Sequence, residues 1–96
     1  MARFLIEVPH EATKEECNAA IQIFLKTGSH FLSHADWGCM DGTHKAWITV
    51  DASSRDEARN ILPPAYRSRA TIVSLNGFAL DPSDAVVAVH ELAHQS

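Results

Sequence analysis

Cysteine, long apolar runs and basic charge are all scarce in this sequence, and each shortage excludes a class of protein. The 96 residues include 2 cysteines, Cys17 and Cys39, which are too few for a disulfide scaffold and lack the C-x-x-C spacing of a zinc knuckle. No apolar stretch approaches the roughly 20 residues of a membrane-spanning helix. Glu7 interrupts the first apolar run, so no signal-peptide core is expected, and we predict a cytoplasmic protein with free thiols.

Basic patches and nucleotide-binding glycine motifs are missing as well. The formal net charge is −4, and the 8 lysines and arginines are scattered along the chain, so neither nucleic acid nor a membrane is an expected partner. Gly38, Gly42 and Gly77 show neither G-x-G-x-x-G nor P-loop spacing. The balance of 46% hydrophobic and 21% charged residues is that of an ordinary globular chain, and the length predicts a single domain over residues 1–96.

Hydrophobic periodicity predicts an alternation of strands and helices. A period of two residues predicts strands over residues 2–9, about 29–39, about 43–51 and about 69–75. Capping boxes and helical spacing predict helices over about 14–27, after Ser54 as far as Pro63, and from Pro82 to the last residues. The order is therefore βαββαβ followed by a closing helix.

The dipeptide Asp41-Gly42 joins the second and third predicted strands. Asp-Gly between two apolar runs is the strongest short hairpin signal, because both turn positions favour positive φ. A two-residue turn here predicts the cross-strand pairs Trp37 with Ala46, Asp36 with Trp47, Ala35 with Ile48 and His34 with Thr49.

This order of elements predicts an α+β protein with the ferredoxin-like fold. In that fold the antiparallel strands lie in the order 4-1-3-2 and both crossover helices cover one face of the sheet. The predicted core face carries Phe4, Ile6, Val8, Phe31, Ala35, Trp37, Ala46, Ile48, Val50, Val73 and Leu75. The predicted opposite face carries Arg3, Leu5, Glu7, His30, Leu32, His34, Asp36, Trp47, Thr49, Ile72 and Ser74.

The opposite face is too apolar to be left in water, since Leu5, Leu32, Trp47 and Ile72 form a contiguous patch on it. A second copy is the economical cover, with the two sheets packed about 10 Å apart. In element order, size and half-polar sheet, the chain resembles the dimeric α+β barrel superfamily, which includes muconolactone isomerase-like and monooxygenase-like small proteins. The resemblance implies a homodimer that binds small ligands between sheet and helices or at the dimer interface.

Polar residues on the same face predict a small-molecule site. His34 and Asp36 are expected about 7 Å apart on one strand, where the carboxylate can orient an imidazole that shuttles protons near neutral pH. His30 and His34 are expected about 13 Å apart, so one strand cannot offer both to a metal, and we assign no metal and no cofactor. The alternative is a set of polar residues at a wet interface or sheet edge. The ligand-binding residues predicted beside the catalytic pair are Arg3, Glu7, His30 and Trp47.

Residues His90 to His94 spell H-E-x-x-H, the motif in which two histidines one helical turn apart bind zinc. A zinc peptidase needs a third ligand, conventionally downstream, and only Gln95 and Ser96 follow here. The apolar stripe of the predicted helix also turns His94 away from the interior. We expect a solvent-facing last turn, and metal capture by His90 and His94 stays open.

Cys39 and His44 are expected to lie close together across the hairpin. Such a pair permits thiolate activation or contact with a soft metal, although a packed cysteine beside a turn histidine accounts for it as well. Cys17 is expected in the core, on the inward stripe of its helix. His10 follows Pro9 at the end of a strand and predicts nothing by itself.

Two functions of different classes remain open. The first is a homodimer that binds a small molecule on its sheet face and carries out proton transfer such as isomerisation. The second is a non-enzymatic binding or structural dimer, with or without a transition metal held through histidines. The sequence does not decide whether the protein is an enzyme.

Overall fold

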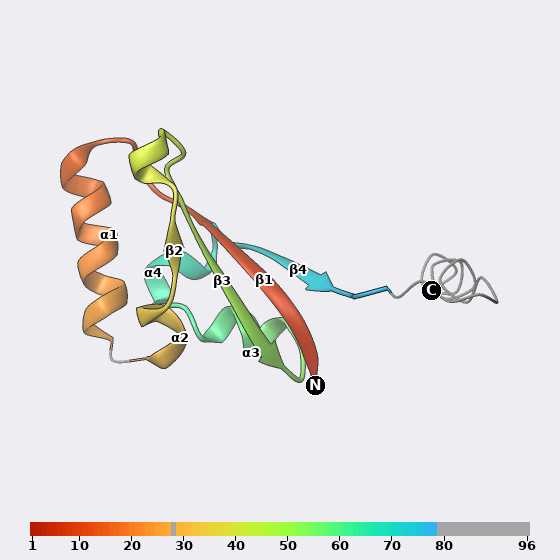
Figure 1. The fold of residues 1–96 in the computed structure, drawn as a ribbon. Helices are drawn as coiled ribbons and strands as arrows, with labels where there is room; N and C mark the ends of the chain where they lie inside the picture. Colours follow the sequence, from red (N-terminus) through yellow and green to blue (C-terminus); the bar gives the residue numbers. More distant parts are fainter. Residues whose placement is uncertain (28, 79–96) are drawn as a thin grey trace.

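A four-stranded antiparallel sheet organises the residues that the computed structural model describes, 1–27 and 29–78 (Figure 1). Its strands are β1 (Ala2–Pro9), β2 (Asp36–Trp37), β3 (Lys45–Ala52) and β4 (Thr71–Leu75). They lie in the order β2-β3-β1-β4, which is the order 4-1-3-2 counted from the other edge. The α+β class and the antiparallel sheet are thus confirmed. The predicted closing helix, with His90 and His94, lies outside the described residues.

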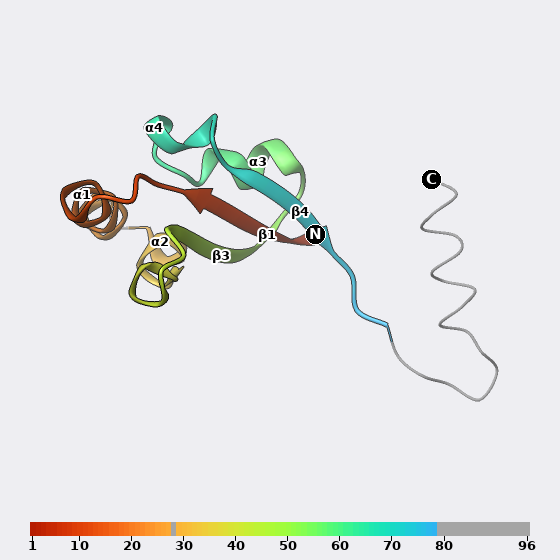
Figure 2. The same cartoon turned by 90° about the horizontal axis from the view of Figure 1, so that it is seen from above.

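Short helices connect the strands. They are α1 (Lys14–Lys26), α2 (His30–Ser33), α3 (Arg55–Asn60) and α4 (Pro64–Arg67), with a 3-10 turn η1 (Cys39–Asp41). Both predicted N-caps form, because Thr13 and Ser54 accept hydrogen bonds from the backbone N–H groups of Glu16 and Glu57 at the starts of α1 and α3. Figure 2 shows α3 and α4 together on one side of β1, with α1 seen end-on farther along the sheet.

The core lies on the face of the sheet that carries the even-numbered residues of β1 and β3. Phe4 faces Val50, Ile6 faces Ile48 and Val8 faces Ala46, and all of these side chains are buried, as predicted. Helix residues complete the same cluster, namely Ala20, Phe24, Leu32, Ala58 and Tyr66, and Leu62 joins them from the loop after α3. The buried side chains of three strands and four helices therefore form one apolar core.

The segment after α1 departs from the prediction of a strand over residues 29–39. The chain instead forms α2 and joins the sheet only at β2. Leu32 is 1% exposed and lies in the core, whereas Phe31 is 39% exposed, the reverse of the predicted faces. A short apolar run fits a helix as well as a strand, so packing of α2 against α1 and β3 decides its structure.

The orientation of β4 is also the reverse of the prediction. Ile72 is 4% exposed and pairs with the buried Ile6, whereas Val73 is 43% exposed. Ile72 and Val73 are adjacent β-branched residues, so the apolar pattern is nearly the same in either phase. The register with β1 decides which of them enters the core.

The hairpin register is confirmed where β2 exists, because Asp36 pairs with Trp47 and Trp37 pairs with Ala46. The predicted two-residue turn is wrong. The connection is η1, which ends at Gly42 with φ 85°, and β2 is too short for the other predicted pairs to form. The predicted register is therefore correct although the loop is longer than the predicted two-residue turn. This longer loop carries Cys39.

The odd-numbered residues of β1 and β3 form the second face, called here the open face. The indole N–H of Trp47 donates to Glu7 (3.1 Å), and Lys45 lies 3.6 Å from the same carboxylate. Val73 is exposed on this face beside Leu5, with which it pairs. Arg3, Glu7 and Trp47 therefore share one face of the sheet, as predicted.

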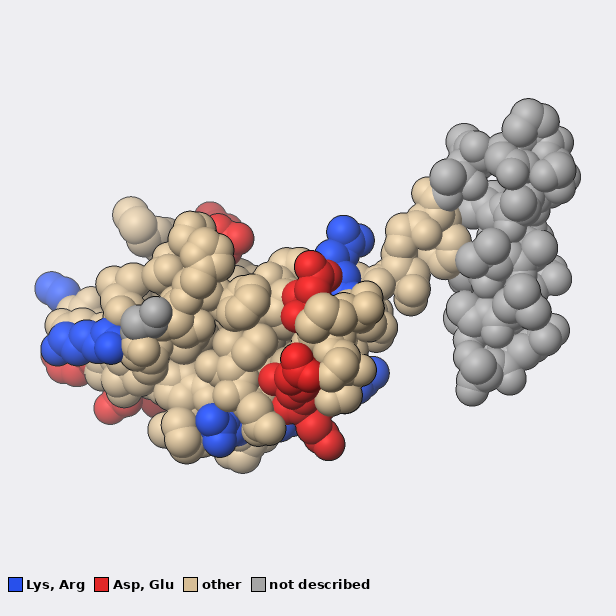
Figure 3. Space-filling model, turned by 90° about the horizontal axis from the view of Figure 1, so that it is seen from below, with Lys and Arg blue, Asp and Glu red and all other residues tan. Residues whose placement is uncertain are grey.

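The surface carries charges of both signs. On the side of the molecule drawn in Figure 3, acidic and basic side chains are interspersed and broad uncharged areas separate them. None of the helices within residues 1–27 and 29–78 has the length and apolar character that crossing a bilayer requires.

Candidate metal site

His10 and His44 extend the buried ladder of β1 and β3 by one more pair. The last assigned pair is Pro9 with Lys45, and beyond it the backbone N–H of His10 donates to the carbonyl of His44 (3.0 Å). His10 has the same parity as Val8, so its side chain is placed toward the core side at the end of the sheet. The two imidazoles meet edge to face, with ring centroids 5.8 Å apart.

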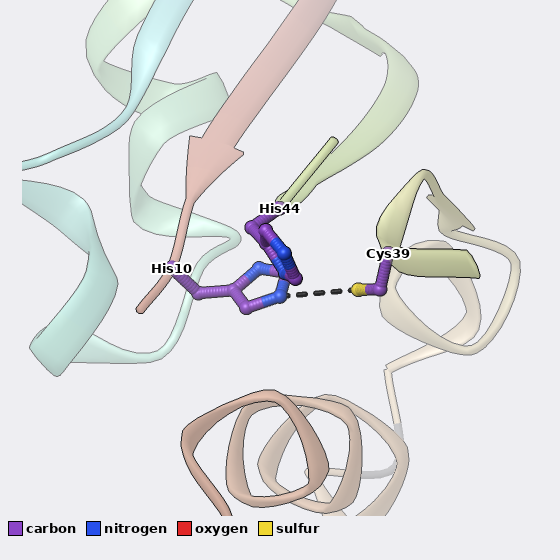
Figure 4. Close-up of side chains that lie close together, drawn as sticks. All are labelled: His10, Cys39 and His44. Atoms are coloured by element: carbon purple, nitrogen blue, oxygen red, sulfur yellow. Dashed lines mark hydrogen bonds between the residues drawn. The ribbon is translucent and has the colours of Figure 1, made fainter. Parts of the chain in front are cut away.

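Cys39, on η1, brings a thiol to these two rings (Figure 4). Its Sγ lies 3.1 Å from Nε2 of His10. One ligand atom from each of His10, Cys39 and His44 lies within 4.8 Å of the other two, and all three residues are partly buried. We call these residues the His-Cys-His cluster; Cys39 and His44 come from the connection between β2 and β3, and His10 follows β1.

Gly38 lets the loop fold tightly enough to present Cys39. A Cβ at this position would lie 2.7 Å from the carbonyl oxygen of Thr43 and 2.8 Å from the ring of Trp47, closer than real side chains approach. The N–H of Gly38 donates to Lys45 (3.0 Å), which ties the loop to the start of β3. A glycine is therefore required where the loop passes over Trp47.

Trp37 holds the ring of His10 in place. Its indole packs edge-on against His10 at 5.7 Å between centroids and against Phe24 of α1 at 5.1 Å. These contacts link the cluster to the apolar core, so the imidazole of His10 is not free to rotate as that of a surface histidine is.

The surroundings favour the uncharged forms of two cluster members. Burial, followed by the neighbouring thiol of Cys17, raises the pKa of Cys39 to about 11. Burial, then the charges of His44 and Arg69, lower the pKa of His10, while Glu11 acts in the opposite direction. Near neutral pH the cluster thus offers a protonated thiol and a neutral imidazole.

The Nδ1 atoms of His10 and His44 are buried and have no hydrogen-bond partner among the described residues. A buried polar group without a partner costs about 1–3 kcal/mol. The sheet therefore ends in two imidazoles whose Nδ1 atoms find no hydrogen-bond partner in the apolar core. An ion coordinated through an Nδ1 atom would offset that atom's cost, whereas coordination through Nε2 of His10, which faces Cys39, would leave the Nδ1 of His10 unpaired.

The donor set suits a tetrahedral zinc ion. With Zn–S of about 2.3 Å and Zn–N of about 2.0–2.1 Å, ligand atoms in such a site lie about 3.3–3.6 Å apart. The cluster, with atoms inside 4.8 Å, needs to contract by little more than about 1 Å. Thiolate and imidazole disfavour Mg²⁺ and Ca²⁺, which take oxygen ligands. Three protein ligands leave a fourth position for water or an external ligand.

The residues that the sequence predicts as catalytic are not brought together. His34 follows α2, and its Nδ1 lies 2.9 Å from the carbonyl oxygen of His30 and 3.2 Å from the hydroxyl of Ser33. The prediction that His30, His34 and Asp36 share one strand face is wrong, because His30 lies in a helix. The side chain of Asp36 makes no hydrogen bond or ion pair with residues 1–27 or 29–78. A functional role for these residues stays a prediction.

The sequence predicts the closeness of two members of the cluster, Cys39 and His44, and the structure confirms it. The sequence does not predict the third member, His10. The register between β1 and β3 is the signal that marks His10. Val8 pairs with Ala46 and Pro9 with Lys45, so the next residues in line are His10 and His44. Two histidines on the buried parity at the same end of two paired strands are a stronger indication than either alone.

Fold and cluster together define a small α+β protein with a mixed histidine and cysteine donor set at one end of its sheet. No family model matches the chain, and no match was found among the curated proteins or the solved structures with which it was compared. Its function is therefore argued from the geometry of the cluster.

Proposed function

We propose that this protein is a transition-metal-binding domain that holds Zn²⁺ through His10, Cys39 and His44. The observation that carries the proposal is that His10, at the end of β1, lies within 4.8 Å of two further donors, Cys39 and His44, on the connection between β2 and β3. Partial burial of all three supports it, because surface residues that meet by chance are seldom buried together.

The chemistry of the donors supports the same conclusion. A thiol whose pKa is raised to about 11 is a poor nucleophile near neutral pH, so the unmetallated cluster is badly suited to covalent catalysis by Cys39. A bound divalent cation reverses this situation, because it displaces the thiol proton and coordinates the thiolate. The role that best fits a protonated, buried thiol between imidazoles is that of a metal ligand.

Cobalt substitution in the full chain tests the proposal directly. Co²⁺ takes the same ligands as zinc, and a thiolate bound to it absorbs in the near ultraviolet, which histidine ligands alone do not produce. We expect one Co²⁺ per chain, a thiolate-to-cobalt band, and displacement of both by Zn²⁺. The band should be lost in Cys39→Ser and kept in Cys17→Ser.

A background variant removes the other candidate ligands. The chain has 6 histidines, and replacing His30, His34, His90 and His94 by alanine leaves only His10 and His44. This variant should bind Co²⁺ with an unchanged band. Absence of the band in the wild type, or its persistence in Cys39→Ser, contradicts the proposal.

A second proposal concerns the open face. We propose that a second copy covers it, giving a ferredoxin-like dimer of the α+β barrel type with a small ligand beside Glu7 and Trp47. The exposure of Val73 and the half-buried Leu5 next to it support an apolar interaction surface there. Proton transfer by His34 and Asp36 has no comparable support, since these side chains do not contact each other.

Light scattering during size-exclusion chromatography tests the dimer. The wild type should elute with twice the mass of one chain, and Val73→Lys should shift it to the monomer, because a charge on the contact face is costly to bury. A wild type that stays monomeric at about 100 µM, where even a weak homodimer associates, contradicts the proposal. The exposed Thr49→Lys on the same face serves as a second variant.

A further inference from the structure

A pocket of about 320 Å³ opens beside the His-Cys-His cluster, lined by Pro9, His10, Glu11 and Arg69. Its size falls at the lower end of the range for small-molecule sites. His10 belongs both to the pocket wall and to the cluster. Anything bound in the pocket therefore lies next to a metal ligand.

Arg69 lines the pocket with its hydrogen-bonding capacity unused. It donates no hydrogen bond within the part of the chain that the structure describes. Arg55, Arg59 and Arg67, by contrast, each donate to backbone carbonyls at 2.6–3.1 Å, which fixes them as structural groups. The guanidinium of Arg69 lies 5.3 Å from the ring centroid of Tyr66, which holds it near the pocket.

Glu11 is a loose counter-ion for Arg69. The closest approach of their charged atoms is 4.0 Å, and the Glu11 side chain is 68% exposed while that of Arg69 is 41% exposed. An exposed pair at this separation contributes little to stability. A ligand with its own negative charge can take the place of Glu11 at small cost.

We propose that this pocket binds a small oxyanion, a carboxylate or phosphate group, which pairs with Arg69 and occupies the fourth position on the metal. The inference rests on the proposed metal site and names the ligand class of that site. A guanidinium presents parallel N–H donors that match two oxygens of such an anion. A zinc ion with three protein ligands accepts an oxygen at its open position.

The location of Arg69 agrees with this role. Arg69 and His10 line the same pocket, and His10 is also a member of the cluster. A metal held by His10 and the guanidinium of Arg69 would both present positive charge to this pocket. Glu11 then limits the affinity in the free protein, since it competes with the anion for Arg69.

Titration of the Co²⁺-loaded full chain with sodium phosphate and, separately, sodium acetate tests the inference. Each anion that reaches the fourth position changes the visible d–d absorption of the cobalt. We expect a saturable change, weakened about tenfold or more in Arg69→Gln and strengthened in Glu11→Gln. The two arms show whether phosphate or carboxylate is the preferred form.

Matched variants separate a pocket effect from a change in overall charge. Lys26→Gln removes an exposed positive charge from the last turn of α1, and Glu15→Gln removes an exposed carboxylate from its first turn. Both should bind the anions as the wild type does. Circular dichroism confirms that each variant is folded.

The thiolate-to-cobalt band reports on the metal site, and the d–d absorption reports on the oxyanion, so the two sites are tested separately. A chain without a thiolate-to-cobalt band overturns both together. The oxyanion site alone is overturned if the band is present but neither anion changes the d–d absorption. It is also overturned if Arg69→Gln, like Lys26→Gln, binds the anions as the wild type does.

Discussion

Two pairs of neighbouring histidines in the described chain differ in nearly every property that matters for binding. His30 and His34 lie one turn apart at α2, both exposed, with ring centroids 4.4 Å apart. Nδ1 of His34 is already within hydrogen-bonding distance of the helix backbone. His10 follows β1 and His44 precedes β3; both are partly buried, and the Nδ1 of each has no hydrogen-bond partner among the described residues.

The difference shows what a sheet register adds to a sequence pattern. Histidines at i and i+4 on a single exposed turn meet because of local geometry, and water satisfies their free nitrogens. A pair at the end of the core ladder meets because two strands align, and the loop between β2 and β3 brings Cys39 as a third donor. Burial and an additional ligand separate a candidate site from two adjacent surface residues.

The largest expected effect concerns zinc affinity. Cys39→Ser removes the only thiolate of the cluster, and we expect Zn²⁺ to bind more than about a hundredfold more weakly, since even loss of a group behind a ligand costs about 10–100-fold. His34→Ala should stay within about twofold of the wild type. Competition with a chromophoric chelator measures both, and equal losses in the two variants would remove the distinction between the pairs.

The second-largest expected effect concerns the unfolding free energy, which depends on the loop that presents Cys39. Gly38→Ala puts a Cβ against Thr43 and Trp47, so we expect a loss of about 2 kcal/mol in unfolding free energy, typical of overpacking. Gly77→Ala is the control, because a Cβ added at Gly77 would meet nothing within 4 Å among the described residues. Urea unfolding of the metal-free proteins gives both values, and an unchanged Gly38→Ala means that the loop is not constrained as described.

The pH dependence of zinc binding shows whether the metal is held by the thiolate of Cys39 or by histidines alone. The pKa of Cys39 is raised to about 11, so below that pH the metal must displace a thiol proton. Because His10 has a lowered pKa and is neutral above its ordinary 6.5, it adds no second proton there. Zinc affinity should rise about tenfold per pH unit between about pH 7 and pH 8.5. Cys39→Ser should lose most of this slope, and a flat wild-type profile contradicts a thiolate ligand.

The smallest effect concerns the stability of the metal-free protein in mild acid. His10 has a lowered pKa in the folded state, so the unfolded chain binds a proton more readily as the pH falls below 6.5. The stability contributed by neutral His10 is present above that pH and is lost progressively on acidification. His10→Asn should flatten the stability curve between about pH 6.5 and pH 5. Parallel curves for the two proteins would show that the ring is not desolvated.

Much of the fold could be predicted because its local patterns are unambiguous. Alternation in Phe4, Ile6 and Val8 is long enough to define β1 and its buried face. The capping box at Thr13 marks the start of α1. At Phe31 and Leu32, and at Ile72 and Val73, two adjacent apolar residues fit either face, and the predicted face is wrong in both places.

The candidate site could be predicted only in part for a different reason. Cys39 and His44 are five positions apart, so a hairpin alone brings them near each other. His10 is more than thirty positions from His44, and nothing local marks it. Its place depends on the pairing of β1 with β3, which aligns Pro9 with Lys45.

By itself, the sequence determined the α+β class, the buried faces of the two long strands and the pairing of Trp37 with Ala46, because periods of two and capping boxes are properties of neighbouring residues. Only the tertiary structure decided that His10 joins Cys39 and His44, and that α2 replaces a strand. Those outcomes depend on contacts between distant segments, where the register of a sheet and the filling of one core select among patterns that are locally equivalent.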